Sequence, residues 1–307
     1  MSSLFLFGAG ASCFSGPCSP NAPPLGANLF QALRAAGGVA ATVDDDLAKV
    51  FEKDFEAGMD RFLVERNAQA SEFLRDMARF FAPFEPLPEN SYFKLLTLLG
   101  GARKKSVIVT TNYDLLIEHA IAQSGCLINY GGLSTDNKNI PVLKIHGSCN
   151  FLPDTGQAQI AGIAFKVPPN HKGAIIQTKI KIAQRASEII EFCENQDSIG
   201  PALALYSPAK QVLYCSDFIN QIQQWWLEAL SKASRIYVIG LRVHLVDEHI
   251  WGPLASAVAP IHYVGREPED FEAWAKNTNR KSAYVLADSF EAAIPKIATH
   301  HGYRKPL

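Results

Sequence analysis

The stretch that decides the fold is SVIVTTNYD, residues 106–114. It opens with an unbroken apolar and β-branched run, which is typical of a strand buried on both faces. Polar residues follow, and a helix is expected over 113–123. Ligands of open parallel sheets bind beyond the carboxyl ends of the strands. The turn that holds Thr111, Asn112 and Asp114 is therefore placed to meet a ligand.

The polar side chains of this turn suit two different roles. The amide of Asn112 offers one acceptor and two donors, so it can hold a diol or a water molecule. Asp114 lies at the start of the expected helix, where it either caps the first turn or contacts the ligand. One residue can do both, and the sequence leaves the choice open.

Two other polar or glycine-rich turns follow apolar strands. They read Gly8-Ala9-Gly10-Ala11-Ser12 and His146-Gly147-Ser148. Glycines let backbone N–H groups approach a pyrophosphate, and Ser12 adds a hydroxyl donor. A tight turn from strand to helix also needs glycine, so this turn alone is equally compatible with a structural role. His146 can accept a proton from a hydroxyl or a water near neutral pH.

The rest of the chain alternates short apolar strands with helices. Strands are expected at 4–7, 106–110, 142–145, 235–239, 261–264 and 283–285. This order predicts an α/β fold with a doubly wound parallel Rossmann-type sheet. Residues 44–82 carry large apolar side chains at helical spacing, which predicts an inserted helical module. A hairpin around 159–167, a helix over 179–194 and a strand at 212–215 are also expected.

This organisation predicts a single domain over residues 1–307. The expected Rossmann core comprises residues 1–38, 90–150 and 205–307, and the helical and irregular module comprises 39–89 and 151–204.

Two strands in the last third of the chain end at Gly240 and Gly265. The carboxyl ends of parallel strands meet at one edge of a sheet, so these turns are expected to line the same crevice. Arg242 and Arg266 follow close behind, and either can pair with a phosphate. The alternative is that both are solvent-exposed loop arginines.

Composition excludes several classes of protein. The chain has 307 residues, 48% hydrophobic and 19% charged, with a net charge of −1. A sizeable core is expected, and no global field indicates binding to nucleic acid or an anionic membrane.

The six cysteines form no C-x-x-C pair, so no metal is expected. No segment reaches the ~20 apolar residues of a spanning helix, and the amino terminus is typical of a strand rather than a targeting segment. We expect a cytoplasmic protein.

The ordered set of turns resembles the sirtuin superfamily, specifically the prokaryotic sirtuin-like domains that lack zinc. The matching elements are Gly8-Ala9-Gly10-Ala11-Ser12, Thr111-Asn112-Tyr113-Asp114, His146-Gly147-Ser148 and the run from Trp225 through Val238-Ile239-Gly240 to Asp247. They occur in the family's order and span nearly the whole chain.

The resemblance implies an NAD-binding Rossmann-type domain with a second module closing over the nicotinamide end. It implies that Asn112 holds the nicotinamide ribose or a water, that His146 acts as a base and that Asp114 organises the turn. The glycine loop would take the pyrophosphate, and the Gly240 and Gly265 turns would lie along the adenosine half. The NAD-binding residues implied are Gly8, Ala9, Gly10, Ser12, Thr111, Gly147, Ser148, Gly240, Arg242, Gly265 and Arg266.

The chain departs from the family in three places. Sirtuin deacylases carry two cysteine pairs for zinc, which are missing here, and they follow the glycine loop with an isoleucine-proline-aspartate-phenylalanine-arginine run. Residues 15–20 read SGPCSP, without the phenylalanine and the arginine. Arg242 stands where a small hydroxyl residue is expected. The first two departures argue against deacylation, and the third leaves the NAD contacts open.

The leading hypothesis is an NAD glycohydrolase that yields nicotinamide and ADP-ribose without a metal. The resemblance also suggests antiviral defence by NAD depletion, which implies self-assembly or a regulatory partner such as an Argonaute-like protein or a ring ATPase. Two alternatives use the same site. One is an NAD-dependent protein deacylase or ADP-ribosyltransferase, and the other is a non-catalytic module that senses NAD or ADP-ribose.

Overall fold

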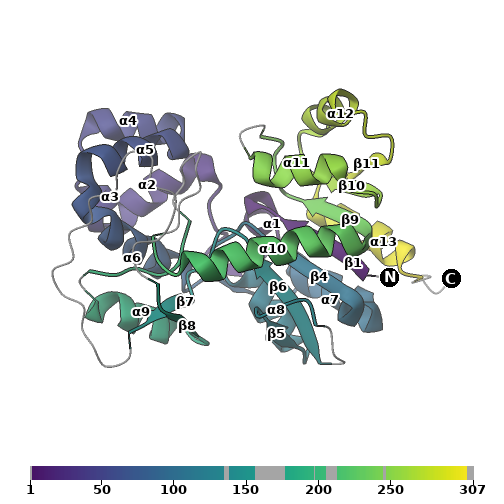
Figure 1. Cartoon of the computed structure of the whole chain (residues 1–307), viewed down its shortest axis with the longest axis horizontal. Coiled ribbons are helices and arrows are strands. Elements are labelled where there is room, and N and C mark those ends of the chain that lie inside the picture. Colours follow the sequence, from purple (N-terminus) through teal and green to yellow (C-terminus); the bar gives the residue numbers. More distant parts are fainter. Residues whose placement is uncertain are drawn as a thin grey trace.

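The computed structural model describes residues 2–134, 138–155, 177–196, 198–204, 213–244 and 247–302. A seven-stranded sheet forms its centre, and every neighbouring pair of strands runs parallel. In chain order the strands are β1 (Ser2–Phe7), β4 (Ser106–Thr110), β5 (Leu127–Asn129), β6 (Asn139–Lys144), β9 (Ala233–Ile239), β10 (Ile261–Val264) and β11 (Ala283–Ala287). Across the sheet the order is β11-β10-β9-β1-β4-β6-β5 (Figure 1).

The chain reverses its direction of travel across the sheet at β1. The strands β4, β6 and β5 lie on one side of β1, and β9, β10 and β11 lie on the other. Phe7 at the end of β1 pairs with Thr110 on β4 and Ile239 on β9, so these three strands end at the same level. This is the switch point at which doubly wound sheets bind ligands. The predicted fold class is confirmed.

Helices cover both faces of the sheet. They are α1 (Ala9–Cys13), α7 (Ser91–Leu99), α8 (Leu116–Gln123), α10 (Ser216–Lys232), α11 (Glu248–Ser256), α12 (Pro268–Asn277) and α13 (Phe290–His300), with the 3₁₀ segment η2 (Gly100–Lys105). In Figure 1, α10 crosses the front of the sheet, where it packs on β1, β6 and β9, while α7, α8 and α13 lie behind it. The rings of Tyr92 and Phe290 pack on Phe7 of the central strand from that rear face.

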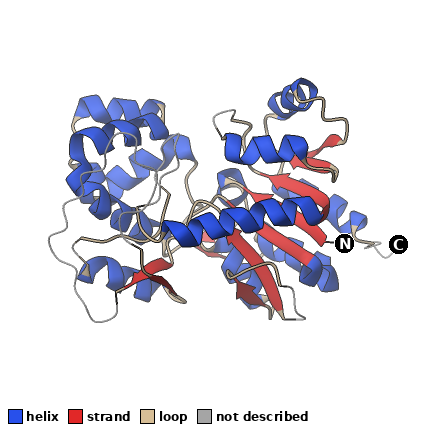
Figure 2. Cartoon of the chain, viewed as in Figure 1, coloured by secondary structure: helices blue, strands red, loops and turns tan. Residues whose placement is uncertain are grey.

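A cluster of helices stands at one end of the sheet, at the left of Figures 1 and 2. It contains α2 (Gly26–Ala36), α3 (Gly38–Ala41), α4 (Asp45–Lys53), α5 (Phe55–Arg66), η1 (Asn67–Gln69) and α6 (Ala70–Phe81). Phe51 is central to its core: it stacks on Phe30 with ring centroids 4.2 Å apart and on Phe73 at 6.1 Å. The large apolar residues at helical spacing therefore form the core of this helical module. The domain boundaries drawn from the sequence stay predictions.

Two small antiparallel pairs accompany the main sheet, and one of them corrects a prediction. Strand β2 (Cys18–Ser19) pairs with β3 (Glu85–Pro86), and β7 (Phe151–Asp154) pairs with β8 (Lys179–Ile182). The helix expected over 179–194 is wrong in its first residues, because Lys and Ile alternate there with the period of a strand. The helix itself, α9, spans Ala186–Asn195.

Three other elements expected from the sequence either differ in the structure or lie partly or wholly outside the described residues. The helix expected from residue 113 begins at Leu116, because the Asp114 carboxylate accepts the Leu116 N–H at 3.1 Å and holds a turn before it. The hairpin expected at 159–167 lies outside the described residues. Of the strand expected at 212–215, residues 213–215 belong to no named strand, and residue 212 lies outside the described residues. Among the helices of the described ranges, none is both long enough and apolar enough to cross a membrane.

Candidate functional site

A cavity of about 500 Å³ lies at the carboxyl ends of the central strands, where the helical module faces the sheet. Nine of the residues predicted from the sequence line it: Ala9, Gly10, Thr111, Asn112, His146, Gly240, Arg242, Gly265 and Arg266. The opposite wall is formed by Lys53, Asp54, Phe55 and Glu56, at the junction of α4 and α5. The cavity therefore sits at the switch point of the sheet and is bordered on one side by the helical module.

Glycines allow the turns after β1 and β9 to touch. The Gly8 N–H donates to the Ile239 carbonyl at 2.9 Å, and the Gly10 N–H donates to the Gly240 carbonyl at 2.8 Å. A Cβ on Gly8 would lie 2.6 Å from the Gly240 oxygen, and one on Gly240 would lie 2.0 Å from the Ala11 nitrogen. These glycines thus serve close backbone packing, and the Gly10 N–H is used within the protein.

Asn112 joins the turn after β4 to the turn after β1. Its Nδ2 donates to the Gly8 carbonyl at 3.0 Å and to the Ser12 hydroxyl at 2.9 Å, and the side chain is 8% exposed. A carbonyl oxygen only accepts, so these bonds fix which side of the amide carries the NH₂. Both amide hydrogens are spent inside the protein. The carbonyl oxygen, which also accepts a long bond from the Thr111 hydroxyl, is the amide atom that can serve a ligand.

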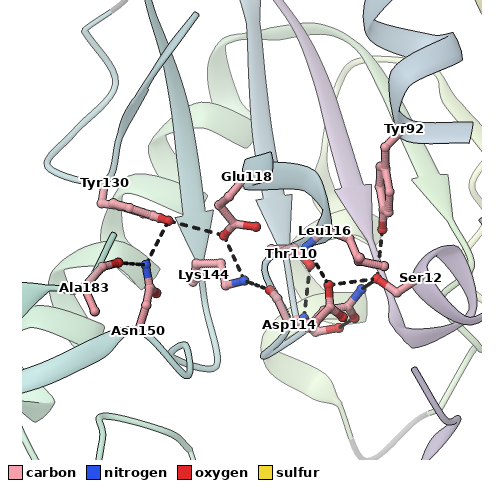
Figure 3. Close-up of polar contacts among 12 residues, drawn as sticks. Ser12, Tyr92, Thr110, Asp114, Leu116, Glu118, Tyr130, Lys144, Asn150 and Ala183 are labelled. Carbon is pink, nitrogen blue, oxygen red and sulfur yellow. Dashed lines mark hydrogen bonds and ion pairs between the residues drawn. The ribbon is translucent and has the colours of Figure 1, made fainter. Parts of the chain in front are cut away.

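Asp114 supports this turn from behind the cavity. One carboxylate oxygen accepts from the Ser12 hydroxyl at 3.2 Å and from the Leu116 N–H at 3.1 Å (Figure 3). Burial raises the pKa of this carboxyl, and the Lys144 ammonium partly opposes that rise. Asp114 and Ser12 line a separate cavity of only about 20 Å³. The Asp114 carboxylate therefore holds the turn before α8 in place, and its contact with a ligand stays a prediction.

A buried ion pair lies beneath the same turn. Lys144 donates to the Asp114 carbonyl at 2.5 Å, and its ammonium lies 2.9 Å from a Glu118 carboxylate oxygen. Figure 3 shows the network continuing from Glu118 through the Tyr130 hydroxyl to Asn150. Sequence reasoning missed this pair. Its one signal was a lysine inside the apolar strand that leads to His146.

A second histidine faces His146 across the cavity wall. The Nε2 atoms of His146 and His249 are 2.8 Å apart, and their ring centroids are separated by 5.1 Å. His146 is only 6% exposed, and His249 lies in the first turn of α11. No local spacing in the sequence connects His249 with His146, because the two residues come from opposite halves of the sheet.

Gly147 and Ser148 lie behind the cavity rather than in its wall. Gly147 has a φ of +79° and pairs with Leu203, and its added Cβ would lie 2.0 Å from the Ala202 carbonyl oxygen. The Ser148 N–H donates to that same carbonyl at 3.1 Å, and its side chain is buried. Both residues hold the segment 198–204 against the end of β6.

The two arginines at the cavity have different surroundings. The Nε of Arg242 lies 2.9 Å from a Glu267 carboxylate oxygen and 3.9 Å from one of Asp270. The guanidinium of Arg266 lies over the Phe14 ring, 3.6 Å from its centroid. A phenylalanine and an arginine therefore meet at the cavity, although residues 15–20 contain neither. The charge of Arg242 is already compensated by carboxylates.

Sequence reasoning also missed the contribution of the helical module. Asp54 caps α5 by accepting the N–H groups of Glu56 and Ala57 at 2.9 and 3.1 Å, which places Phe55 in the cavity wall. In the sequence, Phe55 is one of the regularly spaced apolar residues of 44–82 and carries no separate sign of a binding role. On the far side, Asp288 follows β11 and also lines the cavity. Over the part of the chain that is described, no three His, Cys, Asp or Glu side chains gather as a metal site would need.

The cavity thus offers aromatic surface for flat rings, an arginine for phosphate and carboxylates for hydroxyl groups. A family model described as a SIR2-like domain matches residues 106–160. No curated protein matches the chain. The matched segment carries β4, Asn112, β6 and His146, and SIR2-like domains fit NAD-related activity. The chain is therefore similar to SIR2-like domains over this segment.

Proposed function

We propose that the chain is an NAD glycohydrolase that cleaves NAD to nicotinamide and ADP-ribose. The observation that carries the proposal is that Asn112 and His146, from two neighbouring strands of the segment with SIR2-like similarity, line one cavity. That cavity also contains the glycine turns that end β1 and β9. Its volume of about 500 Å³ lies in the range of small-molecule and cofactor sites.

Hydrolysis requires the bond between the ribose C1′ and the nicotinamide nitrogen to break. The electron pair of that bond goes to the nicotinamide nitrogen, which leaves as a neutral ring. The ribosyl centre is then electron-poor, and water attacks it. In our proposal the Asn112 carbonyl oxygen accepts a hydrogen bond from that water or from a ribose hydroxyl, because the amide NH₂ is occupied by Gly8 and Ser12. His146 takes the proton that the water loses.

The charged residues of the cavity suggest how the rest of the dinucleotide is oriented. Arg266, stacked on Phe14, is the cavity arginine best placed for a phosphate, since the charge of Arg242 is compensated by Glu267 and Asp270. Asp288 follows β11, and a carboxylate at a strand end suits the hydroxyl groups of the adenosine ribose. The nicotinamide end then lies toward Asn112 and His146.

The wider biological role rests on resemblance alone. We propose a cytoplasmic defence effector that depletes NAD when triggered. Such an activity needs restraint, so we propose self-assembly or a regulatory partner such as an Argonaute-like protein or a ring ATPase. A native mass measurement with and without NAD tests self-assembly directly.

The activity itself is tested by incubating the purified chain with NAD and separating the products by chromatography. Equal release of nicotinamide and ADP-ribose without any acyl-lysine peptide is the expected result. Nicotinamide release that depends on an added acetyl-lysine peptide would instead indicate a transferase. Saturable NAD binding with no release in any condition would indicate a sensing module.

A further inference from the structure

The contact between His146 and His249 constrains where protons can sit. The two Nε2 atoms are 2.8 Å apart, a hydrogen-bond distance. A neutral imidazole donates from one ring nitrogen and accepts at the other, so in this pair one Nε2 carries the shared hydrogen and the other accepts it. Two imidazolium rings cannot face each other in this way, because both Nε2 atoms would carry hydrogens. The pair therefore holds one hydrogen between its rings.

Hydrolysis of NAD produces a proton at every turnover. As the oxygen of water bonds to C1′, one O–H bond of the water breaks and its proton needs an acceptor. A base that keeps this proton cannot act again, so it must pass the proton to solvent before the next cycle. His146 is almost fully buried, with 6% of its surface exposed, and its Nε2 points at His249.

We propose that His249 is a positioning and relay residue that orients His146 and carries its proton out of the cavity. This inference rests on the proposed hydrolysis. In the relay, a nitrogen of His146 accepts the water's proton, and the hydrogen on its Nε2 then crosses to the Nε2 of His249. A hydrogen leaves the other nitrogen of His249 to bulk water. Each ring ends neutral with its hydrogen on the opposite nitrogen, and one proton has left the cavity. Exchange of these hydrogens with water then restores the starting tautomers before the next cycle.

The position of His249 suits release of the proton. Its side chain is partly exposed, in contrast to that of His146. It lies in the first turn of α11, where the partial positive charge of the helix end disfavours an imidazolium. The backbone at this point is anchored, because Trp226 Nε1 donates to the His249 carbonyl and Ile250 and Trp251 are buried. The backbone that carries the second ring is therefore anchored, and the residue is partly exposed.

Other ionisable groups around the pair set the background for its titration. Those on the surrounding elements and across the cavity are Arg242, His244, Asp247, Glu248, Arg266, Glu267, Asp288, Asp114, Lys144, Lys53, Asp54 and Glu56. None of them is altered by a substitution at His249, so a change in pH dependence caused by that substitution reports on the histidine pair.

The test compares His249→Phe, which keeps a flat ring but removes both nitrogens, with His249→Gln and with the control His119→Gln on α8. Steady-state nicotinamide release is measured across pH. The relay predicts that His249→Phe lowers kcat about 100-fold, as expected for lost acid–base assistance, with little change in KM and an altered pH–rate profile. His249→Gln retains a hydrogen bond to His146, and its kcat is expected to lie between that of His249→Phe and that of the wild type. An unchanged kcat overturns the relay, and an increased kcat would mean that His249 masks His146.

A second readout separates failure of the relay from failure of the proposed function. The ring nitrogens of His146 are followed by NMR during a pH titration of the wild type and of His249→Phe, both without NAD. A shared hydrogen predicts that the substitution moves the His146 titration, and an unmoved titration contradicts the pair. A wild type that binds NAD but releases no nicotinamide contradicts both the hydrolysis and the relay, whatever the titration shows.

Discussion

The Lys144 ammonium lies 2.9 Å from a Glu118 carboxylate oxygen, and the two side chains are 0% and 5% exposed. Charges removed from water are tolerated when they are paired and hydrogen-bonded. Lys144 also donates to the backbone carbonyl of Asp114 at 2.5 Å, so the ion pair is attached to the turn that carries Asn112. The geometry of the cavity floor therefore depends on a buried charge pair outside the cavity.

Removing one member of this pair is expected to destabilise the fold strongly. Lys144→Met leaves the Glu118 carboxylate buried without its partner, which costs about 3–5 kcal/mol of unfolding free energy. The double variant with Glu118→Leu removes both members of the pair and should recover part of that loss, while the Asp114 carboxyl still loses the nearby ammonium. Urea unfolding of the two variants and the wild type measures both effects. Equal stability of Lys144→Met and the wild type would contradict the assigned pair.

Contact between the β1 and β9 turns should make Gly240 intolerant of any side chain. Gly240→Ala places a Cβ 2.0 Å from the Ala11 nitrogen at a φ of +64°, and we expect a loss of about 2–5 kcal/mol. Gly252→Ala is the matched control. An added Cβ there has no heavy atom within 4 Å, and alanine within a helix should add about 0.5–1 kcal/mol. Similar unfolding midpoints for the two variants would rule out the close approach.

The two cavity arginines have different surroundings, so we expect them to contribute differently to NAD binding. Arg266→Ala removes the guanidinium stacked on Phe14 and should raise the Kd for NAD about tenfold, equivalent to about 1.4 kcal/mol. Arg242→Ala removes a charge already compensated by Glu267 and Asp270 and should change the Kd less than threefold. Titration calorimetry distinguishes them. A larger effect for Arg242 would place the phosphates elsewhere.

Local pattern was enough to predict the parallel sheet, because β1, β4 and β9 each contain a continuous apolar run and each is followed by a helix. The turns themselves were also visible, since glycine and polar residues interrupt apolar runs at 8–12, 111–114 and 146–148. The sequence pattern could not predict which atoms of these turns form hydrogen bonds with one another. The donors of Asn112 are committed to Gly8 and Ser12, which lie 104 and 100 residues away.

Acid should weaken the fold through His262, at the opposite end of its strand from the cavity. Burial, followed by repulsion from His300 and Arg235, lowers the pKa of this ring to about 4 from an ordinary 6.5. The fold thus favours the neutral ring. Its contribution to stability is complete above about pH 6.5 and is lost as the pH falls toward about 4.

The substitution His262→Phe keeps a ring in contact with Tyr237 and removes the titrating group. We expect the urea midpoint of the wild type to fall more between about pH 7.5 and about pH 5 than that of the variant. The difference between the two proteins cancels the contribution of Asp114, whose raised pKa acts in the opposite direction. Parallel pH profiles would show that His262 is not held neutral.

The residues that sequence reasoning missed share one physical property: each acts through a partner from another element. Phe55 lines the cavity because the junction of α4 and α5 borders the carboxyl ends of the strands. His249 comes from the half of the sheet opposite His146, and Glu118 meets Lys144 from the buried face of a helix. Hydrophobic periodicity reports which face of an element is buried, but it carries no information about which side chain lies opposite.

The most direct test of the account is the rate of nicotinamide release from NAD by the wild type and by Asn112→Ala and His146→Ala. Asn220→Ala on the exposed face of α10 serves as the control. Asn112→Ala also removes the bonds to Gly8 and Ser12, so retained folding is checked by circular dichroism for every variant. The account predicts release by the wild type and the control, and a rate at least about 100-fold lower in each folded site variant. Release at the wild-type rate from both site variants would contradict it.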